Sequence, residues 1–567
     1  MRFQRRDDTG FLSLRSSVDN GGWVLVMMLA IGVRFYCISL PYFWTDEAFS
    51  ALVGVQSPER IWFHLGHDVH PPLYFLVLHA WMAVFGEGVF AIRALSALAG
   101  VATVALGMWL IRLISTPRVA LLAGLFLALL PISVRYSQEA RMYTLEGVWL
   151  LGATIALIYW LKSARNRYLM SYLVLMTAAL YTHYLAVLCL LSHWLYLVVL
   201  RLQRDKTLHY LSRPMWWGTN VAIGVLYIPW LISLGNELFL NTEKLETGGD
   251  IFWIPELTIY TLPSAVWKFL TVKSGLEFAS PIYVLLPALV LASVVWVGFK
   301  ERSRLKLELL LVIYVLLPVL IVFVVSFGFP IFVERYMAFA ALGLPMIVAL
   351  AISRLARRTR TLAWISVLLM VGVQLFGLNT IYQQQDDLDD PRNASQYPLD
   401  DIVSRINENA IAGDNIIVDG AYWYYSVAYY NRSDIQPRLY QAPWDNSAAH
   451  RPNGYGASTL IYQDRDKVFL DNLVSISPDI KRVWWVTSTR LADEENHFPG
   501  NWQCVFAQGL GDMELRLYVT RAWAEQITTA TTTTGGGCAT QPPDNREYAL
   551  HDIGLKTVSP RHLPHPE

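Results

Sequence analysis

Two adjacent carboxylates, Asp46 and Glu47, stand directly after the first long apolar run of the chain. Carboxylates beside a membrane are costly unless they are solvated or used in chemistry. A carboxylate in that position is suited to remove the proton of an acceptor hydroxyl as a general base. The structural alternative is a solvated loop in which Thr45 or Asp46 caps a helix that begins at Ala48.

Three further motifs carry histidine, arginine and tyrosine. His70 opens the stretch HPPLYF, Glu139, Arg141 and Tyr143 belong to SQEARMY, and Arg335 follows Glu334 in ERY. An arginine beside a tyrosine suits a lipid phosphate, because a guanidinium group binds two phosphate oxygens at once. The structural alternatives are a polar turn for His70 and ion pairs for Glu139 and for Glu334 with Arg335.

Two isolated residues join the candidate phosphate-binding set. His183 lies in the short turn Thr182-His183-Tyr184, where a single histidine is more often structural. Arg34 lies inside the first apolar run and either extends toward the surface or reaches a phosphate in the same cavity. No metal site is predicted, because His67 and His70 have no third ligand at helical spacing.

The composition indicates a membrane protein. Of the 567 residues, 54% are hydrophobic and only 16% are charged, whereas about 25% are charged in ordinary soluble domains. The formal net charge is +0, which argues against nucleic-acid binding, since a binder of nucleic acid normally carries a basic surplus. No internal repeat, Walker loop, GxGxxG or HExxH motif is present.

Apolar runs of roughly 17–25 residues fill the first two thirds of the chain and are long enough for transmembrane helices. Eleven spans are predicted, at 21–40, 90–112, 118–134, 143–161, 168–182, 184–200, 217–235, 281–299, 307–327, 332–352 and 362–379. Residues 71–85 are apolar but too short for a span and open with two prolines. We therefore expect a juxtamembrane helix there.

The lysines and arginines give an orientation by the positive-inside rule. With a cytoplasmic N-terminus, one face receives most of the basic loop residues, for example Arg112, Arg118, Lys162, Arg165, Arg167, Lys300, Arg302, Arg304, Arg354, Arg357, Arg358 and Arg360. The acidic and histidine candidates then all fall on the other face. This predicts a cytoplasmic N-terminus and an extracytoplasmic C-terminal domain in the bacterial cytoplasmic (inner) membrane.

The predicted domains are a cytoplasmic tail at 1–20, a transmembrane domain at 21–380, an extracytoplasmic α/β domain at 381–525 and a disordered tail at 526–567. In the α/β domain, a helix pattern at 399–410 precedes strands at 416–418, 482–487 and 514–519, and alternating helices and strands favour that class. The final segment is rich in Thr, Gly and Pro and cannot bury a core. Cys504 and Cys538 are the one candidate disulfide pair.

The ordered combination of Asp46-Glu47, HPPLYF, SQEARMY and ERY resembles the GT-C membrane glycosyltransferases. The closest branch is the bacterial protein-O-mannosyltransferase and aminoarabinose-transferase-like group (glycosyltransferase family 39-like), over roughly residues 20–380. The resemblance implies a GT-C fold, a polyprenyl-phosphate sugar donor and inverting transfer on the outer face. By it, Asp46 matches the catalytic acidic residue of the first loop, and Glu139 or Glu146 matches the second acidic position.

The predicted function is therefore transfer of a hexose or pentose from a polyprenyl-phosphate donor to a glycan, lipid or protein hydroxyl. Asp46 and Glu47 are the candidate catalytic residues, and His70, Glu139, Arg141, Tyr143, His183, Arg335 and Arg34 are the candidate donor-binding residues. The expected partners are the lipid-linked sugar, an unspecified acceptor and membrane lipids. No cofactor is firmly implied, and a divalent metal stays an alternative that is not favoured. The alternative is a transporter or flippase of a lipid-linked sugar.

Overall fold

A computed structural model describes the chain from residue 17 to residue 520. Short gaps interrupt the description at 69, 204–208, 241–253, 255, 277–279, 302, 389–392, 442–451, 453, 455, 477–479 and 490–497. The predicted tail at 526–567 and most of the predicted segment 1–20 lie outside the described residues. So does Cys538; Cys504 is disulfide-bonded, whereas Cys37 and Cys189 are free.

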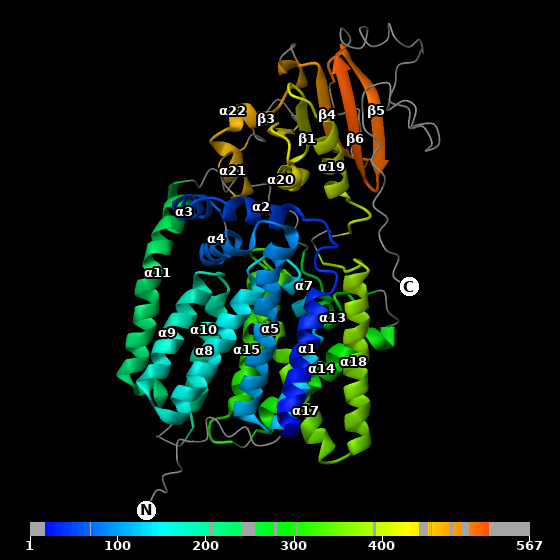
Figure 1. Cartoon of the computed structure of the whole chain (residues 1–567). Helices are drawn as coiled ribbons and strands as arrows, with labels where there is room; N and C mark the ends of the chain where they lie inside the picture. The colour runs from blue at the N-terminus through cyan, green and yellow to red at the C-terminus, as the bar shows by residue number, and fades with distance from the viewer. Residues whose placement is uncertain are drawn as a thin grey trace, which may run out of the picture.

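Long apolar helices form a bundle in the first 382 residues (Figure 1). They are α1 (Ser17–Phe35), α5 (Val89–Ile114), α6 (Pro117–Ala128), α7 (Pro131–Ser137), α8 (Tyr143–Ser163), α9 (Asn166–Leu180), α10 (Ala186–Arg201), α11 (Pro214–Leu240), α14 (Ser280–Phe299), α15 (Leu307–Val325), α16 (Ala338–Ala341), α17 (Gly343–Ala356) and α18 (Arg360–Tyr382). Short 3-10 turns lie at η3 (Tyr210–Ser212) and η5 (Glu334–Met337).

The chain is a multi-pass membrane protein. Within the described residues, seven helical segments are long and apolar enough to cross a membrane, and the bent pair of α6 and α7 makes an eighth. The other predicted spans correspond to α9 and α10, which are 15 and 16 residues long, and to α1, whose apolar part is the 15-residue stretch Gly21–Phe35. Helices of that length are marginal for crossing about 30 Å of hydrocarbon. The predicted polytopic α-helical class is confirmed.

Three short helices lie across one end of the bundle (Figure 1). They are α2 (Thr45–Gly54), α3 (Pro58–Gly66) and α4 (Leu73–Phe85), and α13 (Thr261–Thr271) lies at the same end. The imidazole Nδ1 of His79 on α4 lies 2.9 Å from the carbonyl oxygen of Gly54, which ties α4 to the end of α2. Residues 71–85 therefore form the expected juxtamembrane helix rather than a span.

The C-terminal domain is built on a six-stranded sheet with the order β3-β2-β1-β4-β6-β5. Its elements are α19 (Leu399–Asn409), β1 (Asn415–Asp419), α20 (Ala421–Tyr430), β2 (Arg438–Tyr440), η7 (Gly456–Ser458), α21 (Thr459–Tyr462), α22 (Arg465–Val468), β3 (Phe469–Leu470), η8 (Leu473–Ser475), β4 (Arg482–Ser488), β5 (Trp502–Leu510) and β6 (Met513–Thr520). Strands β1 to β4 run parallel, and β5 and β6 pair antiparallel. The predicted helix and three predicted strands are confirmed.

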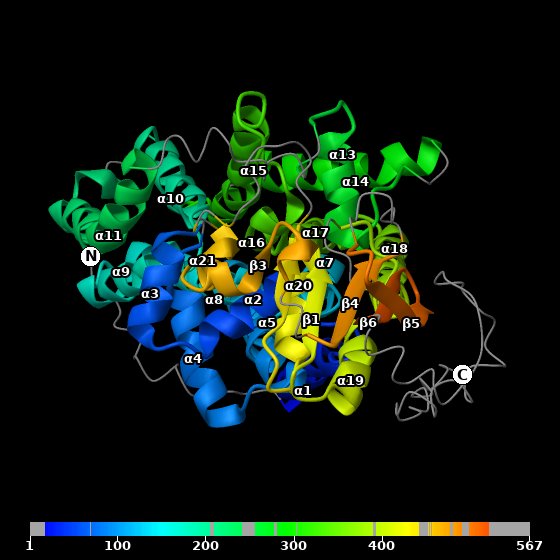
Figure 2. The same cartoon turned by 90° about the horizontal axis from the view of Figure 1, so that it is seen from above.

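The C-terminal domain sits on the end of the bundle that carries α2 to α4 (Figures 1 and 2). Its helix α20 packs along α2. The backbone N–H of Phe43 donates to the hydroxyl of Tyr430 at 2.8 Å, and the rings of Phe43 and Tyr429 lie 4.4 Å apart. The hydroxyl of Thr45 donates to the carbonyl of Tyr422. The C-terminal domain therefore contacts the start of α2 and fixes its position.

The predicted orientation is testable with an engineered cysteine. In a Cys37→Ser background, Gly500→Cys adds a thiol at an exposed position where a Cβ meets no atom within 4 Å. We expect a membrane-impermeant maleimide to label this thiol in intact cells. Arg118→Cys, on the opposite face, is the matched control and should react only after lysis. The reverse pattern would contradict a cytoplasmic N-terminus.

Candidate active site

The first turn of α2 presents Asp46 at the junction of the two domains. Its side chain is 34% exposed, and a carboxylate in the first turn of a helix is stabilised by the helix dipole. The neighbouring loop is fixed, because the indole of Trp44 and the ring of Phe43 are buried. Asp46 is therefore a solvent-reaching carboxylate on a rigid support.

Arg141 connects Asp46 with the motif between α7 and α8. One terminal nitrogen of its guanidinium lies 3.5 Å from Asp46 Oδ2, and the same nitrogen lies 2.8 Å from His70 Nε2. Burial disfavours the charged guanidinium, but Asp46, Tyr143 and Glu139 together outweigh this effect and raise the pKa of Arg141 above its usual value. Its Nε–H is buried and has no hydrogen-bond partner among the described residues.

His70 has a defined tautomer. A guanidinium group only donates hydrogen bonds, so His70 Nε2 accepts from Arg141. The proton of the ring is then on Nδ1, which lies 2.8 Å from Asp68 Oδ2 and donates to it. Asp68, which the sequence analysis did not single out, therefore orients His70, and His70 in turn holds Arg141 beside Asp46.

Glu47 has a different environment from that of Asp46. It is 0% exposed and receives a bidentate pair from Arg93, with distances of 2.8 Å (Nε to Oε1) and 2.6 Å (Nη2 to Oε2). The backbone N–H of Ala140 also donates to Oε1 at 2.8 Å. Glu47 therefore positions the loop instead of facing a substrate, which differs from the predicted catalytic role.

Arg93 completes this support. It is wholly buried near the start of α5 and also donates to the carbonyls of Ile38, Pro41 and Tyr42 at 2.8–3.0 Å. These bonds fix the segment between α1 and α2. The sequence signal for Arg93 was its place inside a predicted span, since ionisable residues in spans are rare and normally paired.

Glu139 lies in a second buried ion pair. Arg135 contacts Glu139 Oε2 at 2.7 Å and Asp386 Oδ2 at 3.4 Å, and all three side chains are buried. Asp386 belongs to the acidic stretch before the C-terminal domain, so this pair also anchors the connection between the domains. Glu146, the alternative second acidic residue, is buried in the first turn of α8 and lies 3.6 Å from His183 Nδ1.

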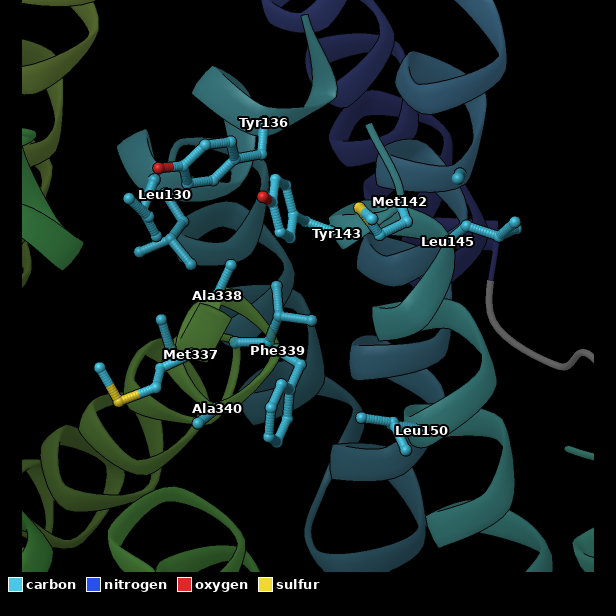
Figure 3. Close-up of a cluster of buried hydrophobic side chains, with 14 of the residues drawn as sticks. Leu130, Tyr136, Met142, Tyr143, Leu145, Leu150, Met337, Ala338, Phe339 and Ala340 are labelled. Carbon is cyan, nitrogen blue, oxygen red and sulfur yellow. The ribbon is translucent and has the colours of Figure 1, made fainter. Parts of the chain in front are cut away.

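Aromatic rings form one wall of the site. The rings of Tyr136 on α7 and Tyr143 on α8 lie 4.9 Å apart and above α16 (Figure 3). The ring of His183 lies 6.0 Å from that of Tyr143 and 5.6 Å from that of Tyr336. Arg335 packs over the ring of Tyr336 at 5.7 Å. The structure thus brings Tyr143, His183 and Arg335 together around Tyr336.

Arg34 has a structural environment. It is 0% exposed and donates to the carbonyls of Leu127 and Ala128 and to the hydroxyl of Ser133 at 3.0–3.3 Å. These groups flank the 58° bend between α6 and α7. Arg34 therefore satisfies the carbonyls at the end of α6, which differs from the predicted role as a phosphate ligand.

The described residues contain no group of three or more His, Cys, Asp or Glu side chains placed to hold a metal ion. The carboxylates near Arg141 are instead paired with arginines or oriented toward histidines. The arrangement offers one solvent-reaching carboxylate, Asp46, beside a buried cation, Arg141, and that combination suits proton removal next to an anionic group.

His183 gives the site a pH-dependent stability. Burial, followed by the charges of His70 and Arg141, lowers the pKa of His183 to about 3. Because this lies below the usual value of about 6.5, the unfolded chain binds the proton first as the pH falls. His183 should therefore cost about 2 kcal/mol of stability between pH 7 and pH 5.

Thermal unfolding in detergent at pH 7 and pH 5 measures this cost. We expect the wild type to lose more stability than His183→Gln over this interval. His209→Gln, at the other end of the bundle, is the control and should behave like the wild type. Equal acid losses in the wild type and His183→Gln would contradict the assignment.

Comparisons with known proteins bear on the fold of this chain. Residues 69–233 match the family described as dolichyl-phosphate-mannose-protein mannosyltransferase. Structures of ArnT from Cupriavidus metallidurans align with TM-scores of 0.58 in the apo state and 0.59 with bound undecaprenyl phosphate. The sequence identity is 15%, and the alignments cover 88% of this chain and 98% of ArnT. The chain adopts the GT-C fold.

Because the alignment to ArnT covers 88% of this chain, it includes residues of both the bundle and the C-terminal domain. The archaeal oligosaccharyltransferase AglB from Archaeoglobus fulgidus aligns with a TM-score of 0.49 and 12% identity, over 83% of this chain and 69% of AglB. Among curated protein sequences, none matches this chain significantly. The predicted GT-C fold is confirmed.

Proposed function

We propose that this chain is a glycosyltransferase that moves a sugar from a polyprenyl-phosphate donor to an acceptor hydroxyl. The observation that carries the proposal is the pair of Asp46 and Arg141, 3.5 Å apart, of which only Asp46 reaches solvent. The matched family is described as a mannosyltransferase that uses dolichyl-phosphate-mannose, and ArnT was solved with undecaprenyl phosphate. Both descriptions fit a lipid-phosphate donor here.

Asp46 is the proposed general base. As the acceptor oxygen attacks the anomeric carbon, its proton passes to Asp46 and the bond from that carbon to the phosphate oxygen breaks. The phosphate leaves with the electron pair, so the anomeric configuration inverts in a single displacement. Removal of the proton matters because a neutral hydroxyl is a poor nucleophile at neutral pH.

Arg141 and Arg335 are the proposed phosphate ligands. The free Nε–H of Arg141 is a charge-assisted donor that a phosphate oxygen would complete. The charge of Arg335 acts on Arg141 and opposes its protonation. A dianionic phosphate between the two guanidinium groups would relieve that repulsion and gain stability as it leaves the sugar.

The acidic and histidine residues of the site lie at the end of the bundle that carries the C-terminal domain. We propose that this end is on the extracytoplasmic side of a bacterial inner membrane. ATP and nucleotide sugars are absent from that side, so a lipid-linked sugar is the fitting activated donor. Donors that carry a hexose or a pentose would identify the sugar. Glycan, lipid and protein acceptors, supplied in turn, would identify the acceptor.

Reconstitution into vesicles with a labelled polyprenyl-phosphate sugar tests the proposal. We expect donor to be consumed, free polyprenyl phosphate to appear, and the label to join an acceptor supplied as a cell-envelope extract. A transporter or flippase would move the intact donor between leaflets without releasing polyprenyl phosphate. Intact donor in every preparation, with folded protein, would contradict the proposal.

The contact of the C-terminal domain with α2 predicts a positioning effect. Tyr430→Phe removes the acceptor of the Phe43 N–H and leaves that donor unsatisfied. We expect kcat to fall about tenfold, with unchanged donor affinity, because only the support of Asp46 is loosened.

The matched control for Tyr430→Phe is Tyr424→Phe, which removes a hydroxyl that bonds Pro437 inside the C-terminal domain. Its kcat should remain near that of the wild type. Equal kcat values for Tyr430→Phe and the wild type would show that this contact with the C-terminal domain does not position Asp46.

A further inference from the structure

A separate cavity lies between α14, α17 and α18. Helix α17 lies in the half of the bundle remote from the C-terminal domain (Figure 1). The volume of the cavity is about 240 Å³. Helix α17 packs against both α14 and α18, and it supplies the floor with residues such as Ala351 and Ile352. Side chains such as Val290 and Met370 form the two walls.

The side chains that line this cavity offer a ligand an apolar surface. Its two hydroxyl groups are occupied, because Ser293 donates to the carbonyl of Leu289 and Ser366 donates to that of Leu362, both at 2.9 Å. Leu289 and Leu369 on the walls are 44% and 48% exposed, so the cavity opens outward. In a membrane this opening faces hydrocarbon, and a hydrocarbon chain is the matching occupant.

The end of the cavity is marked by Trp296 and basic residues. Arg354 donates to the carbonyl of Trp296 at 2.7 Å and is ion-paired with Glu308. The guanidinium of Arg358 lies 5.8 Å from the centre of the Trp296 ring. Arg357 and Arg358 are exposed in the turn between α17 and α18. Their charges therefore stand where an apolar chain in the cavity would meet water.

We propose that this cavity binds an anionic phospholipid of the leaflet opposite the active site. One acyl chain lies along α17 and ends its apolar contact at Trp296, and the phosphate binds Arg357 and Arg358. Basic residues at the membrane surface attract anionic lipid headgroups in this way. This site is distinct from the donor site and does not depend on the proposed transfer reaction.

The position of the arginines separates this lipid from the polyprenyl donor. Arg358 follows α17, whose 14 residues extend about 21 Å at 1.5 Å per residue. Glu334 and Arg335 precede α17 at the active-site end. A phosphate on Arg358 therefore lies at least the length of α17 away from the active-site end of the bundle, too far for its sugar to reach Asp46.

Native mass spectrometry of the detergent-purified chain tests the proposal with two probes, palmitoyl-oleoyl phosphatidylglycerol and the matching phosphatidylcholine. We expect the wild type to bind phosphatidylglycerol more tightly. The double variant Arg357→Gln/Arg358→Gln should lose about 30-fold in that affinity and leave phosphatidylcholine unchanged. Arg118→Gln, exposed at the same end but outside the cavity, is the control and should bind as the wild type does.

A second variant tests the chain-binding part. Ala351→Phe fills the floor of the cavity and should weaken both phospholipids about equally. Equal affinity of the wild type for the two lipids would overturn the proposal, as would undiminished phosphatidylglycerol binding in the double arginine variant. Displacement of phosphatidylglycerol by undecaprenyl phosphate would assign the cavity to the donor and would also overturn it. These outcomes are read from binding alone, so they stand apart from any failure of transfer.

Discussion

Asp46→Asn should lower the rate of sugar transfer by about 10²–10⁴, the usual cost of losing a general base. Asparagine keeps the shape of the side chain but cannot take the acceptor proton. The fold should persist, because Asp46 is one third exposed and its contact with Arg141 is a long one at 3.5 Å. Donor affinity should also persist, since the phosphate is assigned to Arg141 and Arg335.

The measurement for Asp46→Asn separates kcat for donor turnover from the affinity for polyprenyl-phosphate sugar on the same purified protein. Gln56→Ala, just beyond the end of α2, is the control, because its side chain bonds Leu52 and Arg60 and no residue of the site, and it should retain most of the activity. Near-normal turnover in Asp46→Asn would contradict the assignment of the base. Joint loss of turnover and donor binding would instead indicate that Asp46 holds the donor.

Glu47→Gln should act through stability. Glu47 and Arg93 form a fully buried pair, and removing one partner of such a pair typically costs about 3–5 kcal/mol, because the other charge stays buried without compensation. The segment between α1 and α2 would lose its anchor at the same time. We therefore expect a much lower unfolding temperature and a low yield of folded protein.

Thermal unfolding in detergent measures the effect of Glu47→Gln, and Glu59→Gln is the matched control. Glu59 also lies in the first turn of a juxtamembrane helix, but its side chain is exposed, so the unfolding temperature should hardly change. The opposite result would be a Glu47→Gln protein with wild-type stability but no transfer activity. That result would indicate that Glu47 is catalytic, as proposed for Asp46.

The fold class was predictable because the bilayer imposes strong rules on sequence. Apolar runs of span length, such as 307–327, mark helices directly. Charge asymmetry and length together also separated residues 71–85 from the spans. The bend between α6 and α7 was not predictable, because Pro131 is also compatible with a continuous kinked helix, and the group that stabilises the bend is Arg34, nearly 100 positions away.

The strands of the C-terminal domain were predicted unevenly for a physical reason. Strands β1, β4 and β6 are buried runs of β-branched and aromatic residues, which is a strong signal. Strands β2 and β3 contain three and two residues, too few to show a period. Helix α20 was missed because its sequence AYWYYSVAYY is apolar and aromatic on all sides, without the period of an amphipathic helix.

The candidate site was predictable in its members but not in their pairings. Asp46, His70 and Arg141 were expected on one face, and the structure places both Asp46 and His70 in contact with Arg141. Adjacent residues on a helix point in different directions, so Glu47 faces Arg93 while Asp46 faces solvent. Only three-dimensional packing distinguishes those two environments, and sequence spacing alone treated the two carboxylates as one unit.

Binding of undecaprenyl phosphate without a sugar probes the proposed lipid-phosphate site beside Asp46, and it needs neither the donor sugar nor the acceptor to be known. We expect Asp46→Asn to bind this lipid as the wild type does, whereas Arg141→Gln should lose about 10–100-fold in affinity through the missing charge-assisted bonds. Arg167→Gln, an exposed arginine that stacks on Tyr168, should bind normally. Wild-type affinity in a folded Arg141→Gln protein would contradict a lipid-phosphate site beside Asp46.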